Sequence, residues 1–172
     1  AADSPKHFAA VSGEPVGHRR TPLEHREFFL AKKMPCWAVP VSEADWQAGA
    51  LELLRELGLT HASVTAPLKK LAFSLVRLEG QLESQARALE SVNTLAWNAR
   101  KKQWSGACTD LQGFRQALAQ VDVQGAVAVW GGGGTLPILK ACLPDAAFYS
   151  AREGTLKTGS LVTSRALVVW AT

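Results

Sequence analysis

The stretch "VAVWGGGGTLPILK", residues 127–140, joins a short apolar run to four glycines and then to a helical pattern. Apolar runs of this kind are typical of strands buried in parallel sheets. Pro137 suits the first turn of a helix, where its missing N–H has no intrahelical partner. The stretch therefore predicts a strand, a tight turn and a helix, which is the unit from which α/β folds are built.

The turn offers a place for a phosphate group. Gly131, Gly133 and Gly134 lack the Cβ atom that would block a pyrophosphate from the backbone N–H groups and the helix N-terminus. No Gly-Lys-Ser/Thr follows, so the stretch is not a Walker A loop. A glycine turn without any ligand fits the same letters, and both interpretations stay open on this motif alone.

Strand and helix patterns alternate outward from this turn in both directions. A break in character near residues 110–125 predicts two lobes, each with a parallel sheet covered by helices. Residues 91–100 and 103–109 predict a hairpin around "NARKK". The other predicted strands are 7–13, 36–41, 61–68, 125–130, 146–151 and 166–172, and the predicted helices are 22–33, 42–58, 79–90, 110–121 and the one after the glycines.

The helix predicted over 42–58 has the strongest pattern. Ser42 can cap it, acidic residues fill its first turn and Gly58 can end it. Its apolar residues recur at helical spacing, which predicts that one face packs on a sheet. These residues are Trp46, Ala50, Leu53, Leu54 and Leu57.

Composition narrows the classes of function. The net charge of +4 comes from 19 basic and 15 acidic residues in short clusters, whereas a nucleic-acid binder usually has a dense basic face, so no nucleic-acid partner is predicted. No apolar run reaches about 18 residues and the N-terminus does not resemble a signal peptide, which predicts a cytoplasmic protein without a membrane span. Three separated cysteines predict neither disulfides nor a metal site.

The strand after the glycine turn ends in "YSARE". In dinucleotide folds an acidic residue at this position bonds the ribose hydroxyls, whereas an arginine suits a 2′-phosphate. Arg152 therefore favours NADP, while Glu153 beside it leaves NAD open.

The stretch "SVTAPLKK", residues 63–70, places two lysines behind a β-branched run. Lys69 is either a solvated residue at a helix start or a charge that polarises a substrate. Asp110 likewise has a structural interpretation, because it can cap the helix "DLQGFRQAL". Asn93 and Thr94 can simply shape a turn.

Several segments taken together resemble the shikimate dehydrogenase family, whose members reduce 3-dehydroshikimate with NADPH. The order of five motifs between residue 7 and about residue 137 is more specific than any one of them. The resemblance implies an N-terminal α/β substrate-binding lobe, residues 1–109, followed by a partial Rossmann-like nucleotide-binding lobe, residues 110–172. The segments that carry it are "GEPVGHRRTPLEH", "SVTAPLKK", "SVNTL", "GACTDLQGF" and "WGGGGT".

The resemblance also implies roles for single residues. Lys69 and Asp110 become the catalytic pair: the ammonium protonates the alkoxide that hydride transfer creates, and the carboxylate holds the lysine and relays the proton. Substrate-binding residues implied in the same way are Arg19, Thr21, Thr65 and Asn93. Those implied for NADP(H) are Gly131, Gly133, Gly134, Thr135 and Arg152.

The chain departs from the family pattern at Arg19, Arg26, Ser63 and Cys108, where the family has serine or asparagine. Arg19 can grip a carboxylate bidentately or fill the pocket, so the preferred acid is expected to differ from the family norm. The segment after "YSARE" is also too short and too rich in Gly, Ser and Thr for the family's crossover helix. A fragment, a reduced nucleotide lobe, a domain of a multifunctional enzyme and a non-catalytic module that binds a small acidic metabolite all fit these departures.

Overall fold

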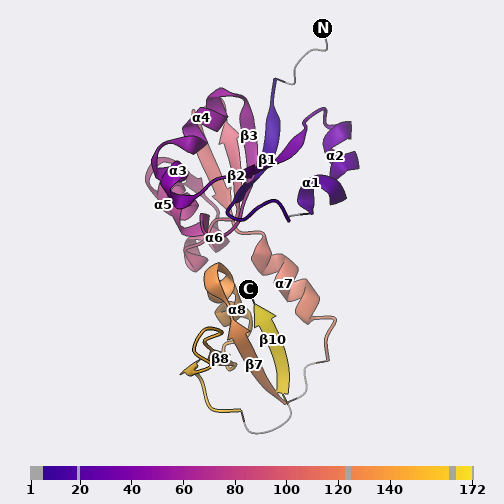
Figure 1. Cartoon of the computed structure of the whole chain (residues 1–172), viewed down its shortest axis with the longest axis vertical. Helices are drawn as coiled ribbons and strands as arrows, with labels where there is room; N and C mark the ends of the chain where they lie inside the picture. The colour runs from indigo at the N-terminus through magenta and orange to yellow at the C-terminus, as the bar shows by residue number, and fades with distance from the viewer. Residues whose placement is uncertain (1–5, 19, 123–124, 163–165, 172) are drawn as a thin grey trace. The chain divides into compact units, whose positions relative to one another are not determined.

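The computed structural model describes residues 6–18, 20–122, 125–162 and 166–171. The chain divides into two compact units, Ala1–Cys108 and Thr109–Thr172, and each unit contains one sheet. Helices and strands alternate along both units (Figure 1). The α/β class predicted from the sequence is therefore confirmed.

The sheet of the first unit has six strands in the order β2-β1-β3-β5-β6-β4. Strands β2, β1 and β3 are parallel, whereas β5 is antiparallel to both β3 and β6. The predicted hairpin is thus confirmed as β5–β6, but it joins the same sheet, so the expectation of a purely parallel sheet is wrong here. The strands are β1 Phe8–Gly13, β2 Cys36–Pro40, β3 Leu59–Val64, β4 Gln81–Leu82, β5 Thr94–Asn98 and β6 Gln103–Ala107.

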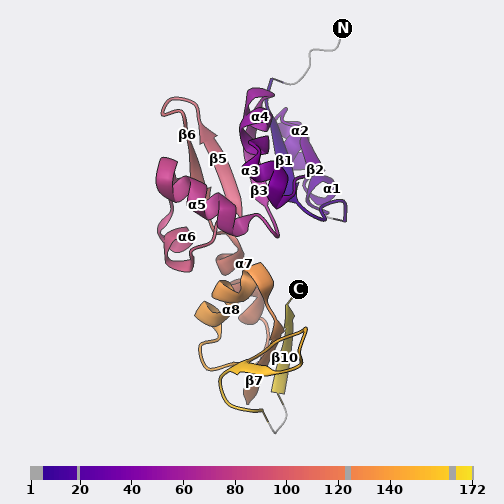
Figure 2. The same cartoon turned by 60° about the vertical axis from the view of Figure 1, so that its left-hand side comes forward.

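Helices cover both faces of this sheet. Helices α1 (Thr21–Glu24) and α2 (Arg26–Ala31) lie over one face, and α3 (Glu43–Gln47), α4 (Ala50–Glu56) and α5 (Lys69–Glu79) lie over the other (Figure 1). Helix α6 (Ser84–Leu89) packs against α5 and β6, and Figure 2 shows it beside them. Between these layers lies an apolar core whose fully buried side chains include Leu59, Val64, Leu68, Val76, Val92 and Leu95.

The helix predicted over 42–58 is two helices. Ser42 does cap it: its Oγ accepts a hydrogen bond from the amide of Asp45, whose carboxylate accepts one from the amide of Ser42. Gly49 then adopts a φ of +93°, which separates α3 from α4. This break turns α4 so that Leu51 is buried while Leu53 and Leu57 are exposed, contrary to the predicted apolar face.

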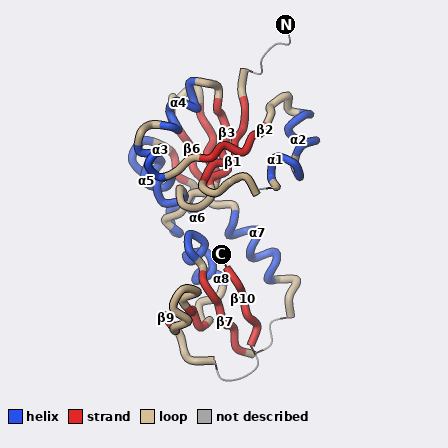
Figure 3. The backbone as a smooth tube through the Cα atoms, viewed as in Figure 1, coloured by secondary structure: helices blue, strands red, loops and turns tan. Residues whose placement is uncertain are grey.

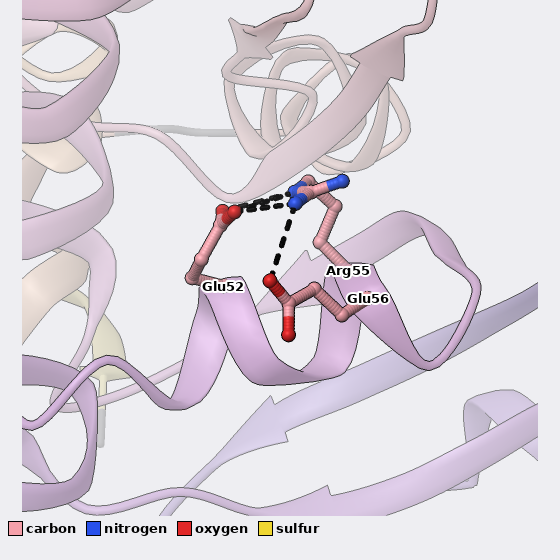
Figure 4. A network of polar contacts seen from close by, with 3 residues as sticks. All are labelled: Glu52, Arg55 and Glu56. Atoms are coloured by element: carbon pink, nitrogen blue, oxygen red, sulfur yellow. Dashed lines mark hydrogen bonds and ion pairs between the residues drawn. The ribbon is translucent and has the colours of Figure 1, made fainter.

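Arg55 holds α4 against the β5–β6 hairpin. Its guanidinium donates to Glu52, lies 3.8 Å from a carboxylate oxygen of Glu56, and stacks over the ring of Trp97 with 5.0 Å to the centroid. Figure 4 shows the three charged side chains together. Trp97 in turn packs edge-on against Trp104 of β6.

Two further predicted helices are shorter than expected. The helix predicted over 22–33 is interrupted at His25, between α1 and α2, although Pro22 does lie in its first turn. The one predicted over 79–90 is reduced to α6, Ser84–Leu89. The cause is Gly80, which ends α5 so close to the carbonyl of Trp104 that a Cβ would collide with it, and the chain then pairs as β4 with β6.

The sheet of the second unit has the order β10-β7-β8-β9. Strands β10, β7 and β8 are parallel, and β9 runs antiparallel to β8. Its core contains Val129, Leu139, Ala146 and Phe148. The elements are α7 Asp110–Leu118, β7 Ala126–Gly131, the 3₁₀ turn η1 Gly133–Thr135, α8 Leu136–Cys142, β8 Ala147–Tyr149, β9 Leu156–Thr158 and β10 Ala166–Ala171.

The segment between β8 and β10 contains no helix among its described residues. It forms the strand β9 with loops on either side (Figure 3). The sequence expectation that this segment is not the usual crossover helix is confirmed for those residues.

Candidate functional site

The end of β1 is joined to the turn that follows β3. The amide of Thr65 donates to the carbonyl of Ser12 at 2.9 Å, and the amide of Glu14 donates to the carbonyl of Ala66 at 3.0 Å. Gly13 allows this approach, because a Cβ there would lie 2.6 Å from the carbonyl oxygen of Ala66. The glycine of one motif is therefore fitted to the backbone of the next.

The segment before β5 joins the same edge of the sheet. The carbonyl of Asn93 accepts from the amide of Val64 at 2.6 Å, and the amide of Asn93 donates to the carbonyl of Ala107 at 3.1 Å. The carbonyl of Lys69 accepts from the amide of Val92 at 3.4 Å. Because β5 is antiparallel to β3 and β6, its start lies beside their carboxyl ends. Four of the quoted motifs thus meet at one edge.

The predicted site residues of the first unit lie on these segments. Asn93 is buried, and its Oδ1 accepts from the Oγ1 of Thr94 at 3.0 Å. Lys69 is the first residue of α5 and is half-buried, so it does begin a helix. Thr65 lies in the turn between β3 and α5. Arg19 falls outside the described residues.

Thr21 lines a cavity that does not include the other described site residues predicted for the first unit. It begins α1 and lines a cavity of about 500 Å³ between α1, α2 and the sheet, whereas Thr65, Lys69 and Asn93 do not line it. The lining is mostly apolar and includes Phe28, Phe29 and Met34. Burial lowers the pKa of His61 in this cavity, which favours its neutral form.

The glycine turn of the second unit needs its glycines for two reasons. Gly131, Gly132 and Gly133 have φ values of +93°, +127° and +39°, a region that other residues rarely adopt. A Cβ at Gly132 would also lie 3.1 Å from the Leu136 side chain. At Gly133 it would meet nothing within 4 Å, so this glycine faces open space.

A second cavity, of about 540 Å³, adjoins this turn. It brings Gly131 and Gly133 together with Arg152, as predicted for a nucleotide site, whereas Gly134 and Thr135 lie in η1 and do not line it. Lys140 and Lys157 add two more basic side chains, and none of the described residues that line the cavity is acidic. The glycine turn and this positive lining suit a phosphorylated ligand.

Lys157 was not predicted to belong to the site. The stretch "REGTLKTGSLVTSR" reads as a polar loop, and a strand of three exposed residues has too little alternation to be recognised. The only available signal was a basic residue a few positions beyond Arg152.

Asp110, the other half of the predicted catalytic pair, is half-buried and is the first residue of α7. It follows the end of β6 by three residues. Its predicted second role as a helix cap is wrong, because the N-cap position of α7 is Thr109.

The described part of the chain contains neither a metal-binding group nor a membrane-spanning helix. The histidines, cysteines and acidic residues there form no group that could hold a metal ion. Nor is any of the helices in those residues long and apolar enough to cross a membrane.

Comparison with known sequences identifies the first unit. The profile of the shikimate dehydrogenase substrate-binding domain matches residues 11–95. The shikimate dehydrogenase (NADP(+)) of Syntrophobacter fumaroxidans is 34% identical over 127 residues, which cover 73% of this chain and 42% of that protein. That of Prochlorococcus marinus is 29% identical over 118 residues, covering 67% of this chain and 40% of that protein.

Solved structures share the fold. Shikimate dehydrogenase 1 from Peptoclostridium difficile superposes with a TM-score of 0.67 at 24% identity, covering 95% of this chain and 61% of that chain. The Thermus thermophilus enzyme, solved in complex with shikimate, gives a TM-score of 0.66 at 23% identity, covering 84% of this chain and 55% of that chain. This chain spans less than half the length of the two curated relatives named above. The profile match, the curated relatives and the shared fold together show that the chain belongs to the shikimate dehydrogenase family.

Proposed function

We propose that this protein reduces 3-dehydroshikimate, or a closely related cyclic acid, with NADPH. The observation that carries the proposal is the set of backbone hydrogen bonds that gathers four family motifs at one edge of the first sheet. The curated relatives are named as NADP(+) enzymes, and the positive cavity beside the glycine turn suits the phosphates of that cofactor.

The substrate is bound by the first unit. Thr65 and Asn93 bond the ring hydroxyls, because both are short polar side chains on segments that the sheet edge holds in place. Thr21 and Arg19 bind the carboxylate. An arginine at position 19 gives a bidentate contact that the family's serine cannot make. The acid that this protein prefers therefore differs from the family's usual acid in the groups around its carboxylate.

Lys69 and Asp110 perform the proton transfer. The reduced nicotinamide, when bound, supplies a hydride to the carbonyl carbon of the substrate. As negative charge develops on the carbonyl oxygen, the ammonium of Lys69 stabilises it and donates a proton to it, which completes the hydroxyl group. Asp110 holds the ammonium in position and helps to return the proton to the lysine.

The cofactor is bound by the second unit. The backbone N–H groups of the turn at Gly131–Gly133 hold its pyrophosphate, and Arg152 binds the phosphate on its adenosine ribose. Gly134 and Thr135 shape the end of the turn. The glycine at position 133 faces open space and so leaves room for a phosphate to approach the backbone.

Replacement of Lys69 by alanine tests the assignment. The kcat for NADPH oxidation with 3-dehydroshikimate is expected to fall by about 10²–10⁴-fold, the usual contribution of a general acid. The matched control is Lys70→Ala, which removes the same charge one position along α5 and is expected to keep the wild-type kcat. Circular dichroism verifies that both variants fold.

Two results would contradict the proposal. Full turnover in Lys69→Ala would remove that residue from the chemistry. A wild-type chain that binds shikimate in calorimetry but never oxidises NADPH would instead identify a binding module of the same family.

A further inference from the structure

A third cavity, of about 510 Å³, is lined by α3, α4, α5 and the β5–β6 hairpin of the first unit. Three of the six tryptophans of the chain line it: Trp46 from α3, Trp97 from β5 and Trp104 from β6. Its volume is within the range of about 300–1,000 Å³ that is usual for small-molecule sites. We call it the tryptophan cavity.

The break between α3 and α4 opens onto this cavity. Gly49 lines it, and a Cβ at Gly49 would meet nothing within 4 Å. Trp46 precedes the break and Leu51 follows it, and both line the cavity. The glycine that contradicts the predicted single helix therefore separates two helices that share one lining.

The tryptophan cavity is separate from the proposed substrate edge. Trp97 lies four residues beyond Asn93 along β5, which is roughly 13 Å at the rise of an extended strand. Thr65, Lys69 and Asn93 do not line the cavity. The family motifs therefore do not account for it.

One tryptophan of the cavity already contacts a cation in this fold. The guanidinium of Arg55 lies over the ring of Trp97, 5.0 Å from its centroid, and donates to both carboxylate oxygens of Glu52. Figure 4 shows how Arg55 points toward Glu52. Arg55 does not line the cavity, whereas Trp97 and Glu52 do. An aromatic face beside a carboxylate is an arrangement that attracts cations.

Carboxylates outnumber ammonium groups in the lining. It contains Glu52 and Glu79, against the single ammonium of Lys102. The hydrogen bond from Arg55 lowers the pKa of Glu52, so this carboxylate stays ionised at neutral pH. Lys102 lies in the exposed turn between β5 and β6, where water and salt screen its charge. The cavity therefore combines aromatic walls with net negative charge.

The indole rings favour one kind of cation. The Nε1–H of an indole is a donor and offers no acceptor. A primary ammonium would leave water for this lining without replacing all of its hydrogen bonds, whereas a trimethylammonium group has no N–H to satisfy. Its methyl groups can also pack on the apolar side chains of Leu51 and Leu75.

We propose that the tryptophan cavity binds the trimethylammonium group of a small quaternary ammonium compound. Trp46, Trp97 and Trp104 supply the aromatic surface, and Glu79 supplies compensating charge. This site is additional to the substrate and cofactor sites and does not depend on the proposed dehydrogenase activity.

Calorimetry on the whole chain with two probes of the same shape tests the proposal. Choline has a quaternary nitrogen, whereas 3,3-dimethyl-1-butanol has an uncharged carbon atom in its place. Choline is expected to bind about tenfold more tightly than the alcohol, which is the effect of a desolvated contact between a cation and aromatic rings.

Two substitutions in the lining should reduce this preference. Trp46→Leu is expected to weaken choline about fivefold and to leave the alcohol nearly unchanged, because leucine keeps an apolar contact but has no aromatic face. Trp46→Phe is expected to retain most of the preference. Glu79→Gln keeps the shape of the side chain and removes its charge, so it should weaken choline alone.

The matched controls lie outside the cavity. Trp37→Leu removes an exposed tryptophan from β2, and Glu43→Gln removes an exposed carboxylate from α3; neither residue lines the cavity. Both variants are expected to bind choline as the wild type does. Circular dichroism verifies the fold of each variant.

Three results would overturn the inference. They are equal affinity of the wild type for choline and the alcohol, no binding of choline, and wild-type affinity for choline in both Trp46→Leu and Glu79→Gln. All of these measurements are independent of NADPH oxidation. Failure of this inference would therefore leave the proposed function standing, and an inactive chain that binds choline would refute only the proposed function.

Discussion

At the scale of single residues, the site depends on places where only a hydrogen atom fits. Gly13 is such a place in the first unit, because its α-carbon faces both the Thr65 side chain and the Ala66 carbonyl. Any side chain there would push the turn that carries Thr65 away from β1. Substrate binding and stability of the first unit should therefore be lost together.

Gly13→Ala is expected to lower the free energy of unfolding of the first unit by about 2 kcal/mol or more, because the added methyl group overpacks against backbone atoms. The affinity for shikimate should fall with it. Urea unfolding followed by tryptophan fluorescence measures the first quantity and calorimetry the second. Gly17→Ala is the control, since a Cβ there meets nothing within 4 Å; equal stability of the two variants would disprove the clash.

The segments that carry the predicted site residues were easier to predict than the contacts between those segments. The motif order located Lys69, Thr65 and Asn93, and the structure places them on segments that hydrogen-bond to one another. The fit of Gly13 against Ala66 could not be predicted, because it joins residues more than fifty positions apart in sequence and depends on the register between β1 and β3.

At the scale of elements, sequence patterns predicted strands better than helix boundaries. A glycine inside a helical pattern costs only about 1 kcal/mol, so Gly49 did not argue for a break between α3 and α4. In the structure Gly49 has a φ of +93° at this break, and Leu51 just beyond it is buried. Conversely, the capping pattern at Ser42 is local, and the structure confirms it.

The cap of α3 gives a prediction for pH. Hydrogen bonds from Ser42 lower the pKa of Asp45 from its ordinary 3.8. The folded state therefore binds fewer protons, so the stabilisation is complete above about pH 4 and is lost as the pH falls through the lower folded pKa. In urea unfolding, Asp45→Asn should have a lower free energy of unfolding than the wild type. This difference should be constant around neutral pH and should shrink on acidification toward about pH 3.

The control for this cap is Glu43→Gln. It removes a charge from the same first turn of α3, but Glu43 does not take part in the capping box. At neutral pH, Glu43→Gln should lower the free energy of unfolding by less than Asp45→Asn does. If the difference in unfolding free energy between Asp45→Asn and the wild type persisted unchanged to the lowest pH, the cap would not require the carboxylate.

At the scale of the whole molecule, the two compact units divide the proposed tasks. The first contains the segments assigned to the acid substrate, and the second contains the glycine turn and the cationic cavity. Hydrogen exchange followed by mass spectrometry should show this division. Shikimate is expected to protect amides of residues 12–14, 64–69 and 92–93, and adenosine 2′,5′-bisphosphate those of residues 131–133 and 150–157.

The control in that experiment is the region around α3 and α4, residues 43–56, which contains none of the residues assigned to either ligand. Its exchange should not change with either compound. Protection of the second unit alone by shikimate would show that the acid binds somewhere other than the edge of the first sheet.

Strand β9 has one more consequence, for protein engineering. The side chains of Leu156, Lys157 and Thr158 are all exposed, so the core of the second unit does not rely on them. Replacements in this strand are therefore expected to leave the stability of the second unit almost unchanged. In a helix packed on the sheet the same changes would disturb a buried face, so this strand can be varied more freely than such a helix.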